Sequence, residues 1–216
     1  MNKPSSNHLA LRRLFLRGLF ASFGAVVALV FPFLARAQDS LLWKTNYYTI
    51  TGATLGEIRQ SLRQSRPWKN KSTVDGMTDW RIEWRYQVAP SNGACQCSSV
   101  TTKTTITTTL PHWKAPTNAP PAVTNAWVRY FTALAKHEAG HAQLALDAVA
   151  EQHQRIHELT EEPDCATLRK RINDLAGQIV DDYRKRDKEY DQRTDHGVKQ
   201  GAVLRLSRLH SEGKRE

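Results

Sequence analysis

The stretch His137-Glu138-Ala139-Gly140-His141 is the part of the sequence from which most of the interpretation follows. It has the pattern H-E-x-x-H and lies in a run whose apolar residues recur at helical spacing. Residues four apart lie on one face of a helix, so the imidazoles of His137 and His141 can bind one Zn²⁺. Glu138 projects beside the metal, where it can accept a proton from a zinc-activated water. The motif predicts a zinc metallopeptidase site, with a helix carrying two coincidental histidines as the alternative.

The N-terminal residues have the three parts of an export signal. Residues 1–17 carry four basic side chains and no acidic one, and an apolar run extends from Gly18 to Leu34. Ala35-Arg36-Ala37 then places small residues around a cleavage point before Gln38. We therefore predict a signal peptide over residues 1–37 and no membrane span after its cleavage, with an uncleaved anchor as the alternative.

Two export routes fit this signal. The pair Arg12-Arg13, followed by Phe15, Leu16 and Arg17, resembles a twin-arginine signal. Leu11 occupies the position where Ser or Thr is usual, so general secretion (Sec) stays equally open. Either route predicts a periplasmic or secreted protein.

The charge of the chain argues against a nucleic-acid partner. The formal net charge of +10 comes from 31 Lys and Arg residues and 21 Asp and Glu residues. Residues 1–37 hold five of the basic residues and no acidic one, so the mature chain keeps a net charge of only +5. Such a modest excess fits a periplasmic protein drawn to anionic polymers of the cell envelope, where the H-E-x-x-H motif predicts a peptide or protein substrate.

The cysteines predict one disulfide and one free thiol. Export implies an oxidising compartment, and the chain has three cysteines, at positions 95, 97 and 165. Cys95 and Cys97 lie too close for a relaxed bridge within an extended strand. We therefore expect one of them to bond Cys165. A C-x-C metal site is the alternative, although no further cysteine pair completes it.

Sequence patterns place β structure before helical structure in the mature chain. Alternating, aromatic and β-branched residues predict strands over 38–52, 78–88 and 98–110, the last two joined as an antiparallel hairpin. Apolar residues at helical spacing predict helices over 54–64, from 121 or 124 to 159, and from 164 to 195.

These elements predict an α+β fold. It comprises a small N-terminal antiparallel β-sheet with a short helix, followed by a long antiparallel helix pair that carries a zincin-like H-E-x-x-H site. We expect a single domain over residues 38–216. Its parts are a β-rich segment at 38–116, a helical zinc-site segment at 121–197 and a basic tail at 198–216.

A catalytic zinc ion needs a third protein ligand, and the nearest candidates along the helix do not fit. Asp147 would complete a metzincin-like pattern, but Leu144 replaces the glycine that would break the helix, so Asp147 faces the wrong side. His153 and His157 lie about 18 Å or more along the helix from His141. The third ligand must therefore come from beyond the helix turn.

Folding the chain back about residues 159–163 brings residues 181–187 level with the H-E-x-x-H motif. Asp182, Tyr183 and Asp187 lie in that window. Asp191 and His196 lie a turn or more further on. Spacing alone does not choose among these five residues.

A second motif lies near the C-terminus. Tyr190-Asp191-x-x-Thr194-x-His196-Gly197, followed by Gln200-Gly201-Ala202, resembles the C-terminal signature of a bacterial family of predicted secreted zinc-dependent proteases, a domain of unknown function. That family combines H-E-x-x-H with Y-D-x-x-T-x-H-G. The similarity extends over nearly all of the mature chain, and the extra cysteine is the one departure.

The resemblance implies a set of site residues. His196 is the implied third zinc ligand, and Asp191 is the alternative ligand or a partner that holds a ligand imidazole. A helix C-terminal cluster is the other interpretation of these two residues. Tyr190 can donate to the oxyanion of a tetrahedral intermediate, with ordinary packing as its alternative. The spacing to Leu110 in the family's Cys-led strand favours Cys95 over Cys97 as the partner of Cys165.

The main hypothesis is an exported zinc-dependent metallopeptidase with Glu138 as general base. The alternative is a non-catalytic envelope binding or scaffold protein stabilised by zinc. A third hypothesis is an amidase that acts on cell-wall peptides. The sequence leaves peptide specificity and oligomeric state open.

Overall fold

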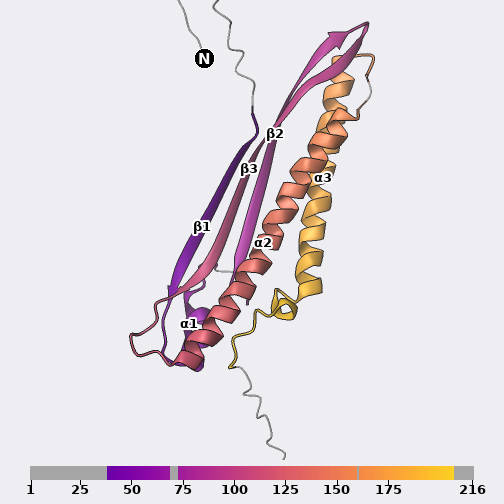
Figure 1. The fold of residues 1–216 in the computed structure, drawn as a ribbon. Helices are drawn as coiled ribbons and strands as arrows, with labels where there is room; N and C mark the ends of the chain where they lie inside the picture. The colour runs from indigo at the N-terminus through magenta and orange to yellow at the C-terminus, as the bar shows by residue number, and fades with distance from the viewer. Residues whose placement is uncertain (1–37, 69–72, 160, 207–216) are drawn as a thin grey trace, which may run out of the picture. The chain divides into compact units, whose positions relative to one another are not determined.

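The computed structural model describes residues 38–68, 73–159 and 161–206. The expected signal peptide and the end of the basic tail lie outside this part of the chain. Figure 1 shows a three-stranded sheet with two long helices packed along one of its faces. This arrangement confirms the predicted α+β class. The elements, in order, are β1 (Ser40–Ile50), α1 (Leu55–Ser65), β2 (Met77–Ser91), β3 (Ala94–Trp113), α2 (Pro121–His157), α3 (Cys165–Thr194) and the 3-10 helix η1 (Val198–Gln200).

β3 is the central strand of the sheet, whose order is β1-β3-β2. β2 and β3 form the predicted antiparallel hairpin, closed by Asn92 and Gly93, which both have the positive φ that a tight hairpin turn requires. β1 pairs with β3 in parallel, so the prediction of an antiparallel sheet was wrong for this strand. The chain reverses at α1 and again at the hairpin, and two reversals leave β1 and β3 running the same way.

Side-chain caps explain where α1 and α3 begin. The predicted capping box is present at α1: the Glu57 N–H donates to Thr54 Oγ1 (3.2 Å), and the Thr54 N–H donates to Glu57 Oε2 (3.3 Å). At α3, Asp164 Oδ1 accepts from the N–H groups of Ala166 and Thr167, both at 2.9 Å. The bonds from Thr167 hold the pKa of Asp164 below its ordinary value. Both helices therefore begin where the sequence predicted.

Small residues let α2 lie close to the sheet. Ala142, Ala145 and Ala148 are fully buried and pack in one cluster with Trp80 of β2 and Ile106 of β3. A larger side chain at any of these alanines would push the helix away from the strands. The H-E-x-x-H turn ends immediately before them, so its position against the hairpin is fixed by this packing.

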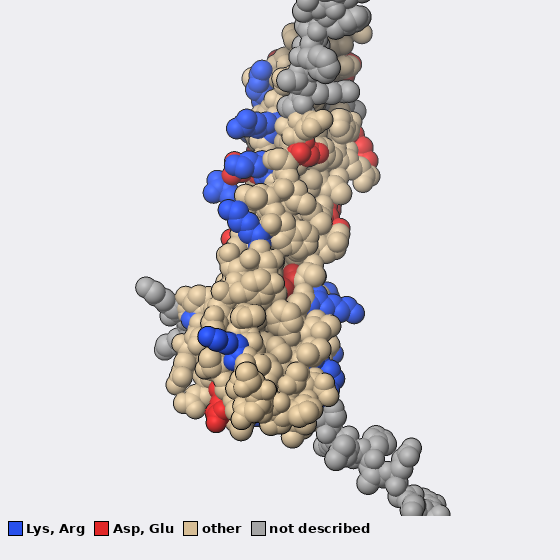
Figure 2. All heavy atoms as spheres, turned by 60° about the vertical axis from the view of Figure 1, so that its left-hand side comes forward, with Lys and Arg blue, Asp and Glu red and all other residues tan. Residues whose placement is uncertain are grey.

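The first half of β1 has little cover from the helices. Leu41, Trp43 and Tyr47 are about half exposed, whereas Tyr48 and Ile50 are buried at the other end of the strand. Figure 2, which turns the β1 side forward, shows broad uncharged areas, with a row of lysines and arginines at the upper left and further ones lower down. Packing therefore anchors β1 mainly through its last residues, and backbone pairing with β3 holds the rest.

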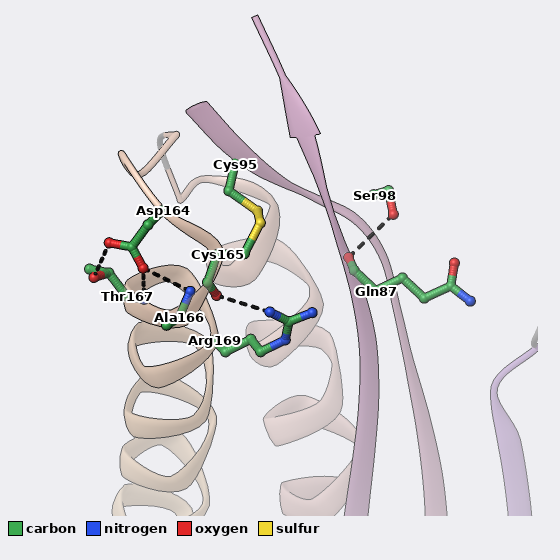
Figure 3. The surroundings of a disulfide bond; sticks show 8 residues. All are labelled: Gln87, Cys95, Ser98, Asp164, Cys165, Ala166, Thr167 and Arg169. Atoms are coloured by element: carbon green, nitrogen blue, oxygen red, sulfur yellow. Dashed lines mark hydrogen bonds between the residues drawn. A yellow bond between two sulfur atoms is a disulfide. The ribbon is translucent and has the colours of Figure 1, made fainter. Parts of the chain in front are cut away.

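A disulfide joins the hairpin to the start of α3 (Figure 3). Cys95 and Cys165 are bonded, with their Cα atoms 5.1 Å apart, which settles the pairing in favour of Cys95 and leaves Cys97 as a free thiol. The Cys95 N–H donates to the Glu162 carbonyl (2.7 Å), and the Glu162 N–H donates to the Cys95 carbonyl (3.1 Å). The disulfide is typical of an exported protein. Within the described residues, no helix is both apolar enough and long enough to span a bilayer.

We expect Cys95→Ser to lower the free energy of unfolding by about 2–4 kcal/mol, because the bond closes a chain segment of 70 residues. A loss of this size corresponds to a melting temperature lower by roughly 10 °C for a domain of this length. Thermal unfolding by circular dichroism measures it. Cys97→Ser is the matched control and should change the melting temperature little. Equal stability of the two variants would contradict a structural role for this disulfide.

Candidate metal centre

The antiparallel packing of α2 on α3 brings the two C-terminal aspartates to the H-E-x-x-H turn. His141 lies level with Asp187, and His137 lies level with Asp191, so two residues four apart on each helix face each other. Further along, the buried Gln152 donates to the Ala176 carbonyl (3.0 Å), which fixes the register of the two helices. The positions of the site residues therefore depend on how α2 and α3 pack against each other, and not on the H-E-x-x-H motif alone.

Three donor atoms converge at one point between the helices. Asp191 Oδ1 lies 3.1 Å from His137 Nε2 and 3.2 Å from His141 Nε2, and the two Nε2 atoms lie 3.2 Å apart. Tetrahedral zinc bonds of about 2.0–2.1 Å place neighbouring donor atoms about 3.3 Å apart. The three atoms are therefore arranged like one face of a metal-binding tetrahedron. These three residues form the candidate metal group within the described part of the chain.

The other ring nitrogens of the two histidines are already held. His137 Nδ1 lies 2.9 Å from Gln200 Oε1, and His141 Nδ1 lies 2.9 Å from Asp187 Oδ1. An Nδ1–H that donates to such an acceptor leaves the Nε2 lone pair free as a metal ligand. A metal ion that displaces the Nε2 protons would then face both Nε2 lone pairs and a carboxylate oxygen. A bound cation satisfies this set of donors, so the residues fit a metal ion.

The electrostatics of the centre favour positive charge. Burial alone would lower the pKa of His141, but its hydrogen bonds to Asp187 and Asp191 outweigh burial and raise that pKa to about 10. Burial acts to raise the pKa of Asp191, yet hydrogen bonds from His137 and His141 hold it well below its ordinary value. The two aspartates therefore give the centre a negative potential that a cation neutralises.

Glu138 lines a cavity of about 160 Å³ beside these donors. It is 3% exposed, and burial raises the pKa of its carboxyl group above the ordinary value. Oε2 has no hydrogen-bond partner among the described residues. Gly76 lies so close that a Cβ there would come within 2.5 Å of Glu138 Oε1, so only glycine leaves room for the carboxylate. Thr78 Oγ1 donates to the Glu138 carbonyl (3.2 Å) and ties this turn to β2.

The segment before β2 forms the facing wall of the cavity, and Asp75 anchors it. The Asp75 carboxylate accepts from Arg66 Nε (2.9 Å), Arg66 Nη2 (2.6 Å) and Tyr130 Oη (2.6 Å). Its backbone carbonyl accepts from Tyr48 Oη (2.7 Å). Burial, reinforced by the Asp75 charge, raises the pKa of both tyrosines, so both stay protonated as donors. The wall is therefore tied to α1, α2 and β1 together.

Tyr190 lies behind His137 and is not among the residues that line the cavity. The two rings are stacked, 11° from parallel with centroids 5.0 Å apart. The phenol donates to the His137 carbonyl (3.3 Å) and accepts from Gln200 Nε2 (3.1 Å). A Cβ on Gly140 would lie 2.2 Å from this hydroxyl, so Gly140 makes the close approach possible. The structure thus gives Tyr190 a position that supports His137.

His196 lies at the rim of the cavity, outside the group of three donors. Its side chain is 51% exposed, and its Nδ1 is 3.2 Å from Asp191 Oδ1. Asp195, His196 and Gly197 all have positive φ, which ends α3 and turns the chain back towards α2. Gly197 then packs against the His137 ring, because a Cβ there would lie 3.0 Å from Cγ. The structure therefore brings together His137, His141 and Asp191, with His196 bonded to Asp191 from the open side.

Two residues that the sequence excluded as metal ligands lie away from the centre, and two residues that support the site were not predicted from the sequence. Asp147 is exposed and accepts from Gln143 (2.8 Å), and His153 Nε2 lies 3.2 Å from Asp39 Oδ1, so neither reaches the centre. Gln200 appears in the quoted motif, but nothing in the sequence signals its contact with His137. Asp75 carries no sequence signal at all, because its role depends on partners from three other elements.

The fold and the site define an α+β protein with a disulfide and a partly buried His-His-Asp group. Residues 45–197 match the model of a family described as a bacterial protein of unknown function (DUF922). The chain therefore belongs to this family. No curated protein and no solved structure matches it.

Measured zinc affinities of variants can decide whether Asp191 or His196 is the third metal ligand. We expect Asp191→Ala to weaken zinc binding by more than about 100-fold, because it removes a converging donor atom. Asp187→Ala should cost about 10- to 100-fold, because it frees only the outer nitrogen of His141. His196→Ala should cost less than about tenfold. Competition with a chromophoric chelator measures all three. A larger loss in His196→Ala than in Asp191→Ala would transfer the ligand role to His196.

Gly140→Ala tests the support of His137 by Tyr190. The new Cβ would overlap the Tyr190 hydroxyl, so we expect the phenol to move and zinc affinity to fall about tenfold. Gly177→Ala is the matched control, since it lies in α3 with no atom within 4 Å of the added Cβ. It should keep the affinity and raise stability by up to about 1 kcal/mol. Unchanged zinc affinity in both variants would contradict the supporting role.

Proposed function

We propose that the protein is a periplasmic or secreted zinc-dependent metallopeptidase that acts on a peptide or protein substrate in the cell envelope. The observation that carries the proposal is the environment of Glu138. Its carboxylate lines a cavity beside three converging donor atoms, and one of its oxygens has no partner within the described chain. Burying a carboxylate in this way costs stability, which favours a role in chemistry for it.

The donor set supports zinc as the metal. Two imidazole nitrogens and one carboxylate oxygen form a common ligand set of catalytic zinc sites, which keep one position open. His137, His141 and Asp191 would hold the ion, while Asp187 and Gln200 orient the imidazoles. A zinc ion held there would polarise the scissile carbonyl group and make a water molecule more acidic.

Glu138 is the general base in this proposal. It accepts the proton of the attacking water and passes it to the leaving amine. Burial raises its pKa, which makes it a stronger base than an exposed carboxylate and a usable acid in the second step. We assign Tyr190 to the positioning of His137, because its hydroxyl is bonded to the His137 carbonyl and to Gln200. His196 steadies Asp191 from the rim.

We expect Glu138→Gln to lower peptide hydrolysis by at least about 100-fold while zinc stays bound, because the amide keeps the shape but accepts no proton. Casein and a fluorogenic peptide library provide the assay, and metal analysis of the same sample gives the zinc content. Removing zinc with a chelator should abolish the activity of the unmodified protein, and adding zinc back should restore it.

The controls distinguish the other functions. Full hydrolysis by Glu138→Gln would exclude the proposed mechanism. One bound zinc without cleavage of any peptide or of purified peptidoglycan would favour a zinc-stabilised binding protein. Cleavage of peptidoglycan alone would favour an amidase on cell-wall peptides.

A further inference from the structure

A second hollow shares a lining residue with the metal cavity and is lined by arginines of α1 and of its C-terminal cap. It has a volume of about 350 Å³, and Asp75 lines both hollows. Arg59 and Arg63 are four residues apart on one face of α1, and Arg66 follows directly after the end of this helix. Apolar side chains complete the lining, including Leu62 and Leu204, which are both buried. We call this the arginine hollow.

The arginine hollow keeps unneutralised positive charge. Arg66 is paired with Asp75, whose carboxylate also accepts from Tyr130, and neither Arg59 nor Arg63 is bonded to this acid. Arg59 donates to the Leu204 carbonyl, which carries no charge. Arg63 has no acidic partner within the described residues. Three guanidinium groups and one carboxylate therefore line the hollow, and Arg59 and Arg63 are exposed to solvent, where an anionic group of a ligand can reach them.

Carboxylate is the anion that this geometry suits best in a peptide substrate. A guanidinium group presents a planar fork of N–H donors that matches the two oxygens of a carboxylate. The buried leucines of the lining exclude part of the solvent, which strengthens such a contact relative to one in open water. Asp75 lines both the hollow and the metal cavity, so the two are neighbours on the molecule, close enough for one extended peptide to contact each of them.

We propose that the arginine hollow binds a carboxylate of the substrate, so that the site acts on acidic peptides. The acidic group is either a Glu or Asp side chain or the C-terminal carboxylate, close in sequence to the bond that lies at the metal. The inference about cleavage rests on the proposed function, whereas the inference about binding does not.

Binding to the Glu138→Gln protein tests the hollow without turnover. The probes are fluorescein-labelled peptides that differ only in Glu against Gln, each with a free or an amidated C-terminus. We expect at least one carboxylate-bearing form to bind about tenfold more tightly than the neutral form at low salt. A loss of affinity on changing Glu to Gln would identify the side-chain carboxylate as the recognised group, and a loss on amidation would identify the C-terminal carboxylate.

Variants of Arg63 test whether the arginine hollow is the source of the preference for carboxylate-bearing peptides. Arg63→Ala, combined with Glu138→Gln, should remove most of the difference, and Arg63→Glu should shift the preference towards a Lys-containing probe. Arg81→Ala is the control, since Arg81 is a highly exposed arginine on β2 and does not line the hollow. Equal binding of acidic and neutral probes, or a preference that survives Arg63→Ala, would overturn the proposal.

Hydrolysis by the unmodified protein separates this inference from the proposed function. Cleavage without any acidic preference would leave a peptidase and remove the arginine subsite. Tight, Arg63-dependent binding of acidic probes without cleavage would keep the subsite and remove the peptidase. Melting temperatures of the Arg63 variants should match that of Arg81→Ala, which excludes loss of folding as the cause.

Discussion

The register between α2 and α3 is the constraint on which the candidate metal centre depends. The hydrogen bond of 2.9 Å from His141 Nδ1 to Asp187 Oδ1 forms only if the helices meet at one relative position along their axes. A slip by one residue would turn the aspartates about 100° around α3 and separate them from the imidazoles. Buried alanines on α2, packed with Ile179 of α3, hold that position. The centre is therefore a product of core packing as much as of its own residues.

Two further segments of the chain complete the candidate metal centre between α2 and α3. The three left-handed residues after α3 return the chain to α2 and deliver Gln200 to His137. On the other side, Asp75 ties the start of β2 to neighbouring elements and places Gly76 over Glu138. Gly197 approaches His137 in the first segment, and Gly76 approaches Glu138 in the second, because a Cβ at either position would come too close. An H-E-x-x-H helix without these approaches would expose its glutamate to water, and its pKa would not be raised by burial.

Local sequence patterns predicted most of the helices and strands, whereas contacts between residues far apart in the chain were not predictable from such patterns. The Thr54 capping box, the Asp164 cap and the alternation along β2 are readable because each depends on neighbouring residues. Asp187 lies level with the motif, as predicted, but the position of Asp191 was placed too far along, because folding the chain about residues 159–163 assumes that α3 begins where α2 ends. In the structure the disulfide draws Cys165 towards the hairpin, and α3 starts beyond the end of α2 (Figure 1). That offset brings Asp191 level with His137. Gln200 and Asp75 act across contacts that no local pattern encodes.

The size of the metal cavity limits how a peptide can bind under the proposed function. Its volume of about 160 Å³ is well below the roughly 300–1,000 Å³ of typical small-molecule sites. Only the group around one peptide bond can enter a cavity of this size. The remaining substrate residues must then lie outside it, beside the half-exposed His196 or in the arginine hollow that shares Asp75 with the cavity. Selectivity on such a surface comes from charge and hydrogen bonds at the rim, since the buried part contacts backbone atoms that all peptides share.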